Sequence, residues 1–490
     1  MVSELYLGID IGTSAVKAVL VDAVGGLAAE ASAPLEVSRP QALWSEQSPE
    51  DWWQATVDAV RALPAPLRAA VSAIGLAGQM HGATLLDRHL RPLRPAILWN
   101  DGRSSRECAE LESAVAGLRT ITGNRAMPGF TAPKLAWVRR HEPAVFAAVE
   151  HVLLPKDFVR LRLTGELASD VSDSAGTLWL DVAQRDWSDE MLAATGLNRR
   201  HMPRLHEGPS ATGRLTAAAA AQLGLPAVQV HAGGGDNAAG AVGVGVVRPG
   251  EAFLSLGTSG VLFLACAGYR PDAARGVHTF CHAVPHQWHQ MSVILSAASC
   301  LDWGAHAFGA EGPAALMAEV EARGRPAASV HFLPYLSGER TPHNNPHAKG
   351  VLFGLTHDSD RAELGQAVLE GVAFAFRDGL DALLATGNPV DAIAVIGGGA
   401  RSRYWGRVLA SVLQRPLDFR DGSTVGAAYG AARLAWIGSE GLEATAAAQP
   451  PALLDTVHPD ASFAEVLIPR LERFRALYAA LHPQFEKQAP

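Results

Sequence analysis

The chain has 490 residues, more than one hydrophobic core usually spans, so its length predicts two domains, with three as the alternative. Hydrophobic residues make up 48% of the sequence and charged residues 18%, and the formal net charge is −8. This composition excludes a disordered chain and argues against a nucleic-acid-binding surface. We therefore expect small-molecule partners.

The number and spacing of cysteines and the length of the apolar runs predict the cellular compartment of the protein. Four cysteines without metal-type spacing indicate buried free thiols in a reducing compartment, which favours the cytoplasm. The first residues lack a basic leader, and no apolar run approaches the roughly 18 residues of a membrane span. We expect neither secretion nor membrane insertion. The oligomeric state stays open, with a homodimer as one option.

The first half is expected to be α/β. Its expected elements, in order, are a hairpin of strands 5–9 and 15–22, a helix from 49 to about 63, a strand at 71–77, a hairpin over 83–99, helices and loops over 104–226, and a strand at 227–230. Polar or glycine-rich residues follow three of these strands, at Asp10, Gln79 and Asp236. Ligands bind at such strand ends in an open α/β sheet.

The second half begins like the first, because a Gly-Thr-Ser turn lies between two apolar strands in both. Its expected elements are a hairpin of strands 252–256 and 260–265, helices at 296–308, 313–322 and 360–385, a strand at 392–396, a helix to about 413, and a small-residue helix from Val425 to Trp436. Two facing copies of one fold are the simplest explanation, with a chance tripeptide as the alternative. The predicted domains are residues 1–244 and 245–490.

Asp236 is a single carboxylate among glycines near the middle of the chain. Gly233, Gly234 and Gly235 predict a turn in which a ligand approaches the backbone closely and Asp236 faces a cleft. Two interpretations follow, a catalytic base or a helix N-cap.

The two Gly-Thr-Ser turns predict a phosphate site. Asp10 suits Mg²⁺, directly or through water, and the backbone N–H groups and hydroxyls of the turns suit phosphates. The candidate nucleotide-binding residues are Gly12, Thr13, Ser14, Gly257, Thr258, Gly398 and Gly399. The P-loop and Rossmann glycine motifs are both missing from the sequence. We therefore expect a nucleoside triphosphate between two domains, although Gly397–Gly399 taken alone also fits an ordinary tight turn.

An alcohol acceptor needs a hydroxyl-binding pocket, for which Gln79, His81, Asn100, Asp101 and Arg103 are candidates. In a phosphoryl transfer, Asp236 would orient and deprotonate the hydroxyl that attacks the phosphate. If a water molecule attacked instead of that hydroxyl, the protein would be an ATPase. The alternatives are a structural histidine for His81 and a salt bridge to Asp101 for Arg103.

Together these motifs resemble the FGGY family of carbohydrate kinases over residues 5–436. The motifs are Leu7–Ser14, Gly78–Gly82, Trp99–Arg103, Gly234–Asn237 and Gly397–Ser402. Within the family, residues 43–47, 124–134 and 337–346 are similar to bacterial members that phosphorylate D-xylulose.

The resemblance implies two ribonuclease-H-like domains of the actin/hexokinase type, with ATP and sugar in the cleft between them. It implies Asp236 as general base, Asp10 on the side of the metal and phosphates, and Met80 and His81 at the sugar. The implied reaction is ATP + D-xylulose → ADP + D-xylulose 5-phosphate with Mg²⁺, a step of xylose catabolism. Two alternatives stay open: a kinase for a ribulose-type ketose or a polyol, and a sugar-independent actin-like ATPase.

Overall fold

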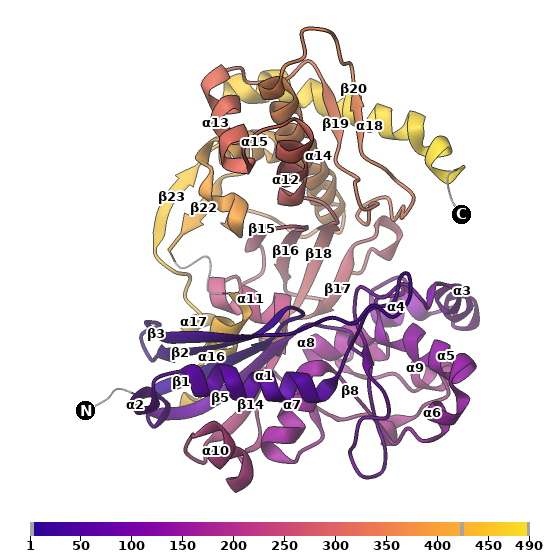
Figure 1. The fold of residues 1–490 in the computed structure, drawn as a ribbon, viewed down its shortest axis with the longest axis vertical. Helices are drawn as coiled ribbons and strands as arrows, with labels where there is room; N and C mark the ends of the chain where they lie inside the picture. The colour runs from indigo at the N-terminus through magenta and orange to yellow at the C-terminus, as the bar shows by residue number, and fades with distance from the viewer. Residues whose placement is uncertain (1–3, 422–425, 488–490) are drawn as a thin grey trace.

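The computed structural model describes residues 4–421 and 426–487. Within these residues, a large sheet lies in each half of the chain (Figure 1). The first sheet has the order β13 (Ala211–Arg214), β14 (Gln229–Gly235), β5 (Val71–Gly78), β1 (Leu5–Ile11), β2 (Ala15–Asp22), β3 (Leu27–Pro34). The second has the order β17 (His278–Cys281), β18 (Trp288–Ile294), β16 (Gly260–Cys266), β15 (Ala252–Leu256), β21 (Ile393–Ile396), β22 (Leu417–Arg420), β23 (Leu453–Val457).

Helices and small two-stranded sheets surround both large sheets. The helices of the first half are α1 (Pro49–Ala62), α2 (Ala65–Arg68), α3 (Ser105–Ala114), α4 (Leu118–Thr122), α5 (Thr131–His141), α6 (Pro143–Ala147), α7 (Pro155–Thr164), α8 (Val171–Ser174), α9 (Asp189–Ala194), α10 (Ala217–Leu223) and α11 (Asp236–Val244). Those of the second half are α12 (Ala298–Ala307), α13 (Pro313–Arg323), α14 (Arg361–Leu384), α15 (Arg403–Leu413), α16 (Gly426–Glu440), α17 (Ala444–Ala447) and α18 (Ala461–Glu486). The paired short strands are β4 (Glu46–Gln47) with β7 (Ala96–Ile97), β6 (Thr84–Leu86) with β8 (His151–Leu153), β9 (Ala168–Asp170) with β12 (Arg204–His206), β10 (Leu180–Asp181) with β11 (Asp186–Trp187), and β19 (His331–Leu333) with β20 (Val351–Phe353).

Strands β1, β5 and β14 are parallel neighbours, so their carboxyl ends meet at one edge of the first sheet. Both faces of β1 are covered. Alternate residues from Leu5 to Ile11 pack in a cluster with Trp52 of α1, and Tyr6 packs with Ala428 of α16. Burial on both faces explains why β1 is almost continuously apolar until Asp10.

Helix α16 belongs to the second half by sequence but lies on the first sheet. Glycines allow this close approach. A Cβ at Gly8 would lie 1.8 Å from the carbonyl oxygen of Ala428, and one at Gly75 would lie 1.9 Å from that of Ala431. Helix α16 is also the helix expected from Val425 to Trp436, although Val425 itself lies outside the described residues. The predicted boundary near Gly245 stays a prediction.

Most expected elements are present, and one expectation is wrong. Residues 233–235 do not form a turn, because β14 continues through them to Gly235. Only Gly233 of these three has a left-handed φ, +75°, and a Cβ there would lie 1.7 Å from the carbonyl oxygen of Leu76. The glycines therefore let β14 pack tightly against β5 rather than bend away from it.

The expected hairpin over residues 83–99 is present in an irregular form. Antiparallel bridges join Ala83 with Ile97 and Leu86 with Pro92, and the backbone N–H of Leu93 donates to the carbonyl oxygen of Leu85 at 2.9 Å. Both arms also pair outside the hairpin, β6 with β8 and β7 with β4. All four cysteines are free and buried, and none of the helices in the described ranges is long and apolar enough to cross a membrane.

Candidate active site

Asp10 and Asp236 lie at the edge where the three parallel strands end. Asp10 is opposite Ala77 of β5, and Ala77 is in turn opposite Gly234 of β14. Asp236 follows two residues after Gly234, as the first residue of helix α11. The fold therefore brings together two carboxyl groups that are far apart in the sequence.

Asp236 is half-buried and is held in one orientation by its neighbour. The backbone N–H and the Nδ2 group of Asn237 donate to Asp236 Oδ1 at 2.7 and 2.9 Å. The helix cap is Gly235, and it makes no side-chain capping bond, so the N-cap interpretation of Asp236 is not observed. Burial raises the pKa of Asp236 to about 6, and the two hydrogen bonds limit the rise.

Asp10 combines burial with an unused acceptor. Its Oδ1 is buried and has no hydrogen-bond partner among the described residues. Burial, and then the charge of Asp236, raises the pKa of Asp10 to about 7, while Lys17 on the neighbouring strand lowers it. A buried carboxylate oxygen without a partner is costly and suits a cation.

A cavity of about 310 Å³ lies beside Asp236. It is lined by Met80, His81, Trp99, Met127, Gly129, Phe130, Asp236, Asn237, Ser255, Ser259, Val261, His278, Phe280, Met291, Val293 and Arg340. Its walls come from both halves of the chain. Of the predicted hydroxyl-binding residues, it contains Met80 and His81.

His81 is prepared to accept a hydrogen bond. Its Nδ1 lies 2.5 Å from the carbonyl oxygen of Gly176, so Nδ1 carries the hydrogen and donates it. Burial lowers the pKa of His81 to about 3, which keeps the ring neutral. The neutral ring leaves Nε2 as an acceptor for a ligand hydroxyl. His81 itself has a φ of +72°, and Lys134 Nζ donates to its carbonyl oxygen at 2.8 Å.

The structure places the other four predicted hydroxyl-binding residues outside this lining. Gln79 supports the Gly12-Thr13-Ser14 turn: its Oε1 accepts from Thr13 Oγ1 at 2.9 Å. Asn100 is exposed in a turn. Asp101 and Arg103 pair with each other at 2.7 Å.

Arg103 is fully occupied as a structural residue. It also pairs with Glu46 at 2.8 Å, and its guanidinium lies 3.6 Å from the ring centroid of Trp44. Asp101 further accepts from the backbone N–H of Ser45 at 2.6 Å. The observed pair with Asp101 is the salt bridge that was the alternative prediction for Arg103. The burial of this pair could not be seen from the sequence alone.

A second cavity, of about 870 Å³, lies between β15 and α15. Its lining includes the predicted nucleotide-binding residues Gly257, Thr258, Gly398 and Gly399. A Cβ at Gly399 would lie 2.4 Å from the side chain of Leu256, so only glycine fits there without a shift. Gly12, Thr13 and Ser14 form the turn between β1 and β2, and Trp99 Nε1 donates to Thr13 Oγ1 at 3.0 Å.

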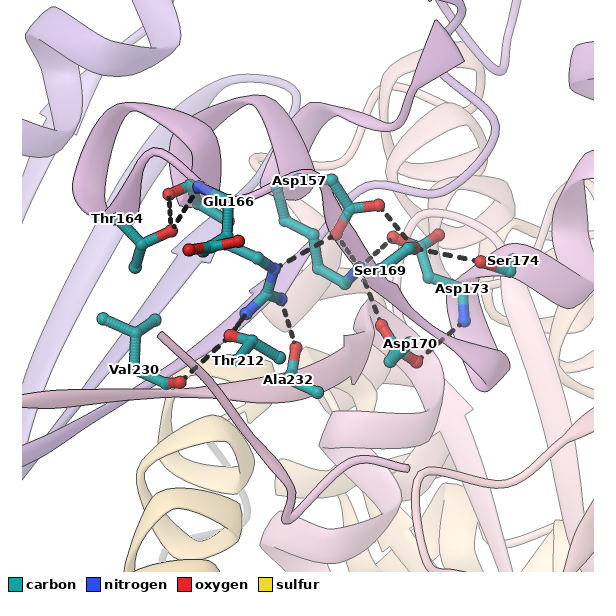
Figure 2. Close-up of polar contacts among 12 residues, drawn as sticks. Asp157, Thr164, Glu166, Ser169, Asp170, Asp173, Ser174, Thr212, Val230 and Ala232 are labelled. Carbon is teal, nitrogen blue, oxygen red and sulfur yellow. Dashed lines mark hydrogen bonds and ion pairs between the residues drawn. The ribbon is translucent and has the colours of Figure 1, made fainter. Parts of the chain in front are cut away.

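A buried ionic cluster supports the strand that leads to Asp236 (Figure 2). Lys156 Nζ lies 2.8 Å from Asp157, 2.7 Å from Asp170 and 3.0 Å from Asp173. Burial raises the pKa of Asp173 well above its usual range, while the charge of Lys156 lowers it in part. Lys156 pairs with all three acids and Arg160 lies 3.6 Å from Asp157, so two cations lie beside the buried carboxyl groups.

The cluster reaches β14 at two points. Arg160 donates to the carbonyl oxygen of His231 at 2.9 Å and also to that of Ala232. Ser172, which donates to Asp170, accepts from the backbone N–H of Gly235 at 3.1 Å. The backbone immediately before Asp236 is therefore fixed from both sides.

Several cavity residues had not been predicted from the sequence. Asn237 is adjacent to Asp236, so its proximity was a usable signal. Arg340 lies in the 337–346 segment that carried part of the resemblance, without a role assigned to it. Ser259 belongs to the second Gly-Thr-Ser turn, which was predicted to bind phosphates, whereas Ser255 and His278 lie in strands of the second sheet and gave no local signal.

Comparison with known proteins identifies the family. Residues 5–243 match the N-terminal domain and residues 252–439 the C-terminal domain of the FGGY family of carbohydrate kinases. The chain belongs to this family. The FGGY assignment makes it a carbohydrate kinase, for which ATP is a substrate, and confirms the expected two-domain, actin-like ATPase type of fold.

Individual FGGY relatives are similar over nearly the whole chain. A xylulose kinase of Escherichia coli (strain K12) is 55% identical over 98% of this chain and 99% of its own. A solved structure of a "xyloylose kinase" from Brucella ovis has a TM-score of 0.95 at 50% identity, covering 98% of this chain and 100% of the other. That of xylulose kinase from Rhodospirillum rubrum has a TM-score of 0.89 at 32% identity, covering 99% and 100%.

Proposed function

We propose that this FGGY kinase transfers the γ-phosphoryl group of ATP to the terminal hydroxyl of D-xylulose, giving ADP and D-xylulose 5-phosphate. The observation that carries the proposal is that Asp236, an oriented carboxylate, lies in the wall of a cavity that also contains His81. The relatives named above as xylulose kinases match nearly the whole chain and support D-xylulose as the sugar.

In the proposed reaction, Asp236 accepts the proton of the terminal hydroxyl as its oxygen attacks the γ-phosphorus. The bond between that phosphorus and the bridging oxygen of ADP breaks. With a pKa of about 6, Asp236 is mostly ionised at pH 7 and can still accept a proton. His81 Nε2 and the Met80 side of the cavity would hold the sugar in place.

The nucleotide would lie between the two sheets. The N–H groups and hydroxyls of Gly12, Thr13 and Ser14 on one side, and of Gly257 and Thr258 on the other, suit the phosphates. Gly398 and Gly399, at the cavity between β15 and α15, suit the nucleoside. Trp99 and Gln79 would act indirectly, by holding the first turn in shape.

Asp10 is the residue that would hold Mg²⁺, directly or through water, because its Oδ1 is buried without a partner in the described part of the chain. Bound there, the ion would neutralise charge on the phosphates. The buried free thiols support the cytoplasmic location expected from the sequence.

A coupled ADP-release assay with a sugar panel tests the proposal. D-Xylulose should give the highest kcat/KM among D-xylulose, D-ribulose, L-ribulose, xylitol, glycerol and D-gluconate. A preference for another of these would replace the substrate while keeping the kinase. ADP release that no sugar stimulates would favour the actin-like ATPase instead.

A further inference from the structure

Arg340 lines the sugar cavity but belongs to the second half of the chain. It lies between β19 and β20, and its neighbour Thr341 fastens it to the second sheet. The backbone N–H of Thr341 donates to the carbonyl oxygen of Val293 at 3.1 Å, and Thr341 Oγ1 accepts from the backbone N–H of Val293 at 3.1 Å. The position of Arg340 is therefore set by the second sheet, opposite Asp236 and His81 of the first half.

The guanidinium of Arg340 makes no hydrogen bond or ion pair with any residue in the described ranges 4–421 and 426–487. Arg103 is the contrasting case, because its guanidinium is already paired with Asp101 and Glu46. Burial lowers the pKa of Arg340, and the charge of the adjacent Glu339 raises it in part without a hydrogen bond or ion pair between the two side chains. A partly buried cation with five unused donors is costly unless a ligand supplies acceptors.

The other residues that line the cavity indicate what kind of ligand could accept hydrogen bonds from Arg340. Asp236 and His81 Nε2 are hydrogen-bond acceptors, and Ser255, Ser259 and Asn237 have groups that donate and accept. A neutral polyhydroxylated ligand satisfies this mixture, since each of its hydroxyls both donates and accepts. The fixed fork of a guanidinium fits two neighbouring sugar oxygens, such as a carbonyl and the hydroxyl next to it.

We propose that Arg340 is a sugar-binding residue contributed by the second half, donating to oxygen atoms of the sugar held by Asp236 and His81 from the first half. The sugar thereby bridges the two halves. This inference rests on the proposed function only in placing the sugar in this cavity. By this inference, Arg340 favours sugars that present two neighbouring oxygen atoms to its guanidinium over sugars that lack such a pair of oxygens.

The test compares Arg340→Met and Arg340→Lys with the parent enzyme. Loss of hydrogen bonds from a charged donor should raise the KM for D-xylulose roughly 10- to 100-fold in Arg340→Met, with the KM for ATP within about twofold. Arg340→Lys should recover part of the loss, because one donor with a charge remains. Arg200→Met, which removes an exposed guanidinium far from the cavity lining, is the matched control and should leave both values unchanged.

Thermal unfolding separates ligand binding from a structural role. Without sugar, Arg340→Met should melt at the same temperature as the parent or higher, because it removes a cation that has no protein partner. With saturating D-xylulose, the parent should gain more stability than the variant. An unchanged KM for the sugar in Arg340→Met, or a lower melting temperature without sugar, would overturn the inference.

The proposed function can fail without the inference failing. The parent's sugar panel decides the substrate, and the ratio of variant to parent decides the role of Arg340. If the parent prefers another sugar, the same ratio is measured with that sugar.

Discussion

Asp10 and Asp236 stand on either side of strand β5, and the charge of Asp236 adds to burial in raising the pKa of Asp10 to about 7. Interacting carboxyls release their protons in steps that belong to the pair. In the proposed complex, Asp10 would lie near the metal and phosphates and Asp236 near the sugar, and burial raises the pKa of both carboxyls toward neutral pH.

Replacing Asp236 by Asn should abolish most turnover while leaving the fold intact. Asn keeps the size and the contacts to Asn237, but it cannot accept the proton, so kcat should fall roughly 10²- to 10⁴-fold. ATP binding, measured by calorimetry, should stay within about threefold of the parent. Near-normal kcat in this variant would show that another group is the base.

The pH profile should report the raised pKa values. The folded-state values of Asp236, about 6, and Asp10, about 7, predict that kcat/KM declines as the pH falls through this range, because the protonated carboxyls no longer act. Lys17→Met removes a cation that lowers the pKa of Asp10, so the decline should move to higher pH. Lys349→Met, at an exposed position, is the control. The prediction fails if the Lys17 and Lys349 variants give the same profile.

Asp10→Asn should stabilise the protein at alkaline pH at the expense of activity. Because the folded-state pKa of Asp10 is raised above its unfolded value, the folded state binds more protons, and stability is lost as the pH rises from about 4 through 7. Asn removes this cost. The gain in melting temperature over the parent should be larger at pH 8 than at pH 5 in metal-free buffer. An equal gain at both pH values would contradict the linkage.

Lys156→Met should destabilise the first half severely. It leaves Asp157, Asp170 and Asp173 buried with one cation fewer, which costs on the order of 3–5 kcal/mol of unfolding free energy. Arg162→Met on the same helix breaks a part-exposed pair with Glu50 and the contacts of its guanidinium with the rings of Trp53 and Phe158, and should cost less than about 1 kcal/mol. Urea denaturation of both variants measures the difference, and comparable losses would show that the cluster contributes little.

The sequence predicted those site residues that lie at or near the carboxyl end of a strand. Asp10, His81 and Gly399 sit in short polar or glycine-rich motifs whose chemistry is visible locally. Asp101 and Arg103 form a similar motif, but they bind Glu46 and Ser45, which are distant in sequence, so only the tertiary structure shows that these groups are already occupied.

Long-range packing also explains the wrong expectation at residues 233–235. The glycines 233–235 were expected to bend the chain, and they instead lie in β14, where Gly233 leaves room for the backbone of β5. Glycine marks both turns and close approaches, and the sequence does not distinguish them. Arg340 became a candidate only when the cavity showed that its guanidinium has no protein acceptor in the described chain.

Helix α16 has a consequence for biosynthesis. The first sheet is made from residues near the start of the chain, yet the helix that covers β1 and β5 ends at Glu440. During translation, the apolar strand face around Gly8 and Gly75 waits for its cover until nearly nine tenths of the polypeptide has left the ribosome. Until then the nascent chain exposes this apolar face, which favours aggregation or association with chaperones.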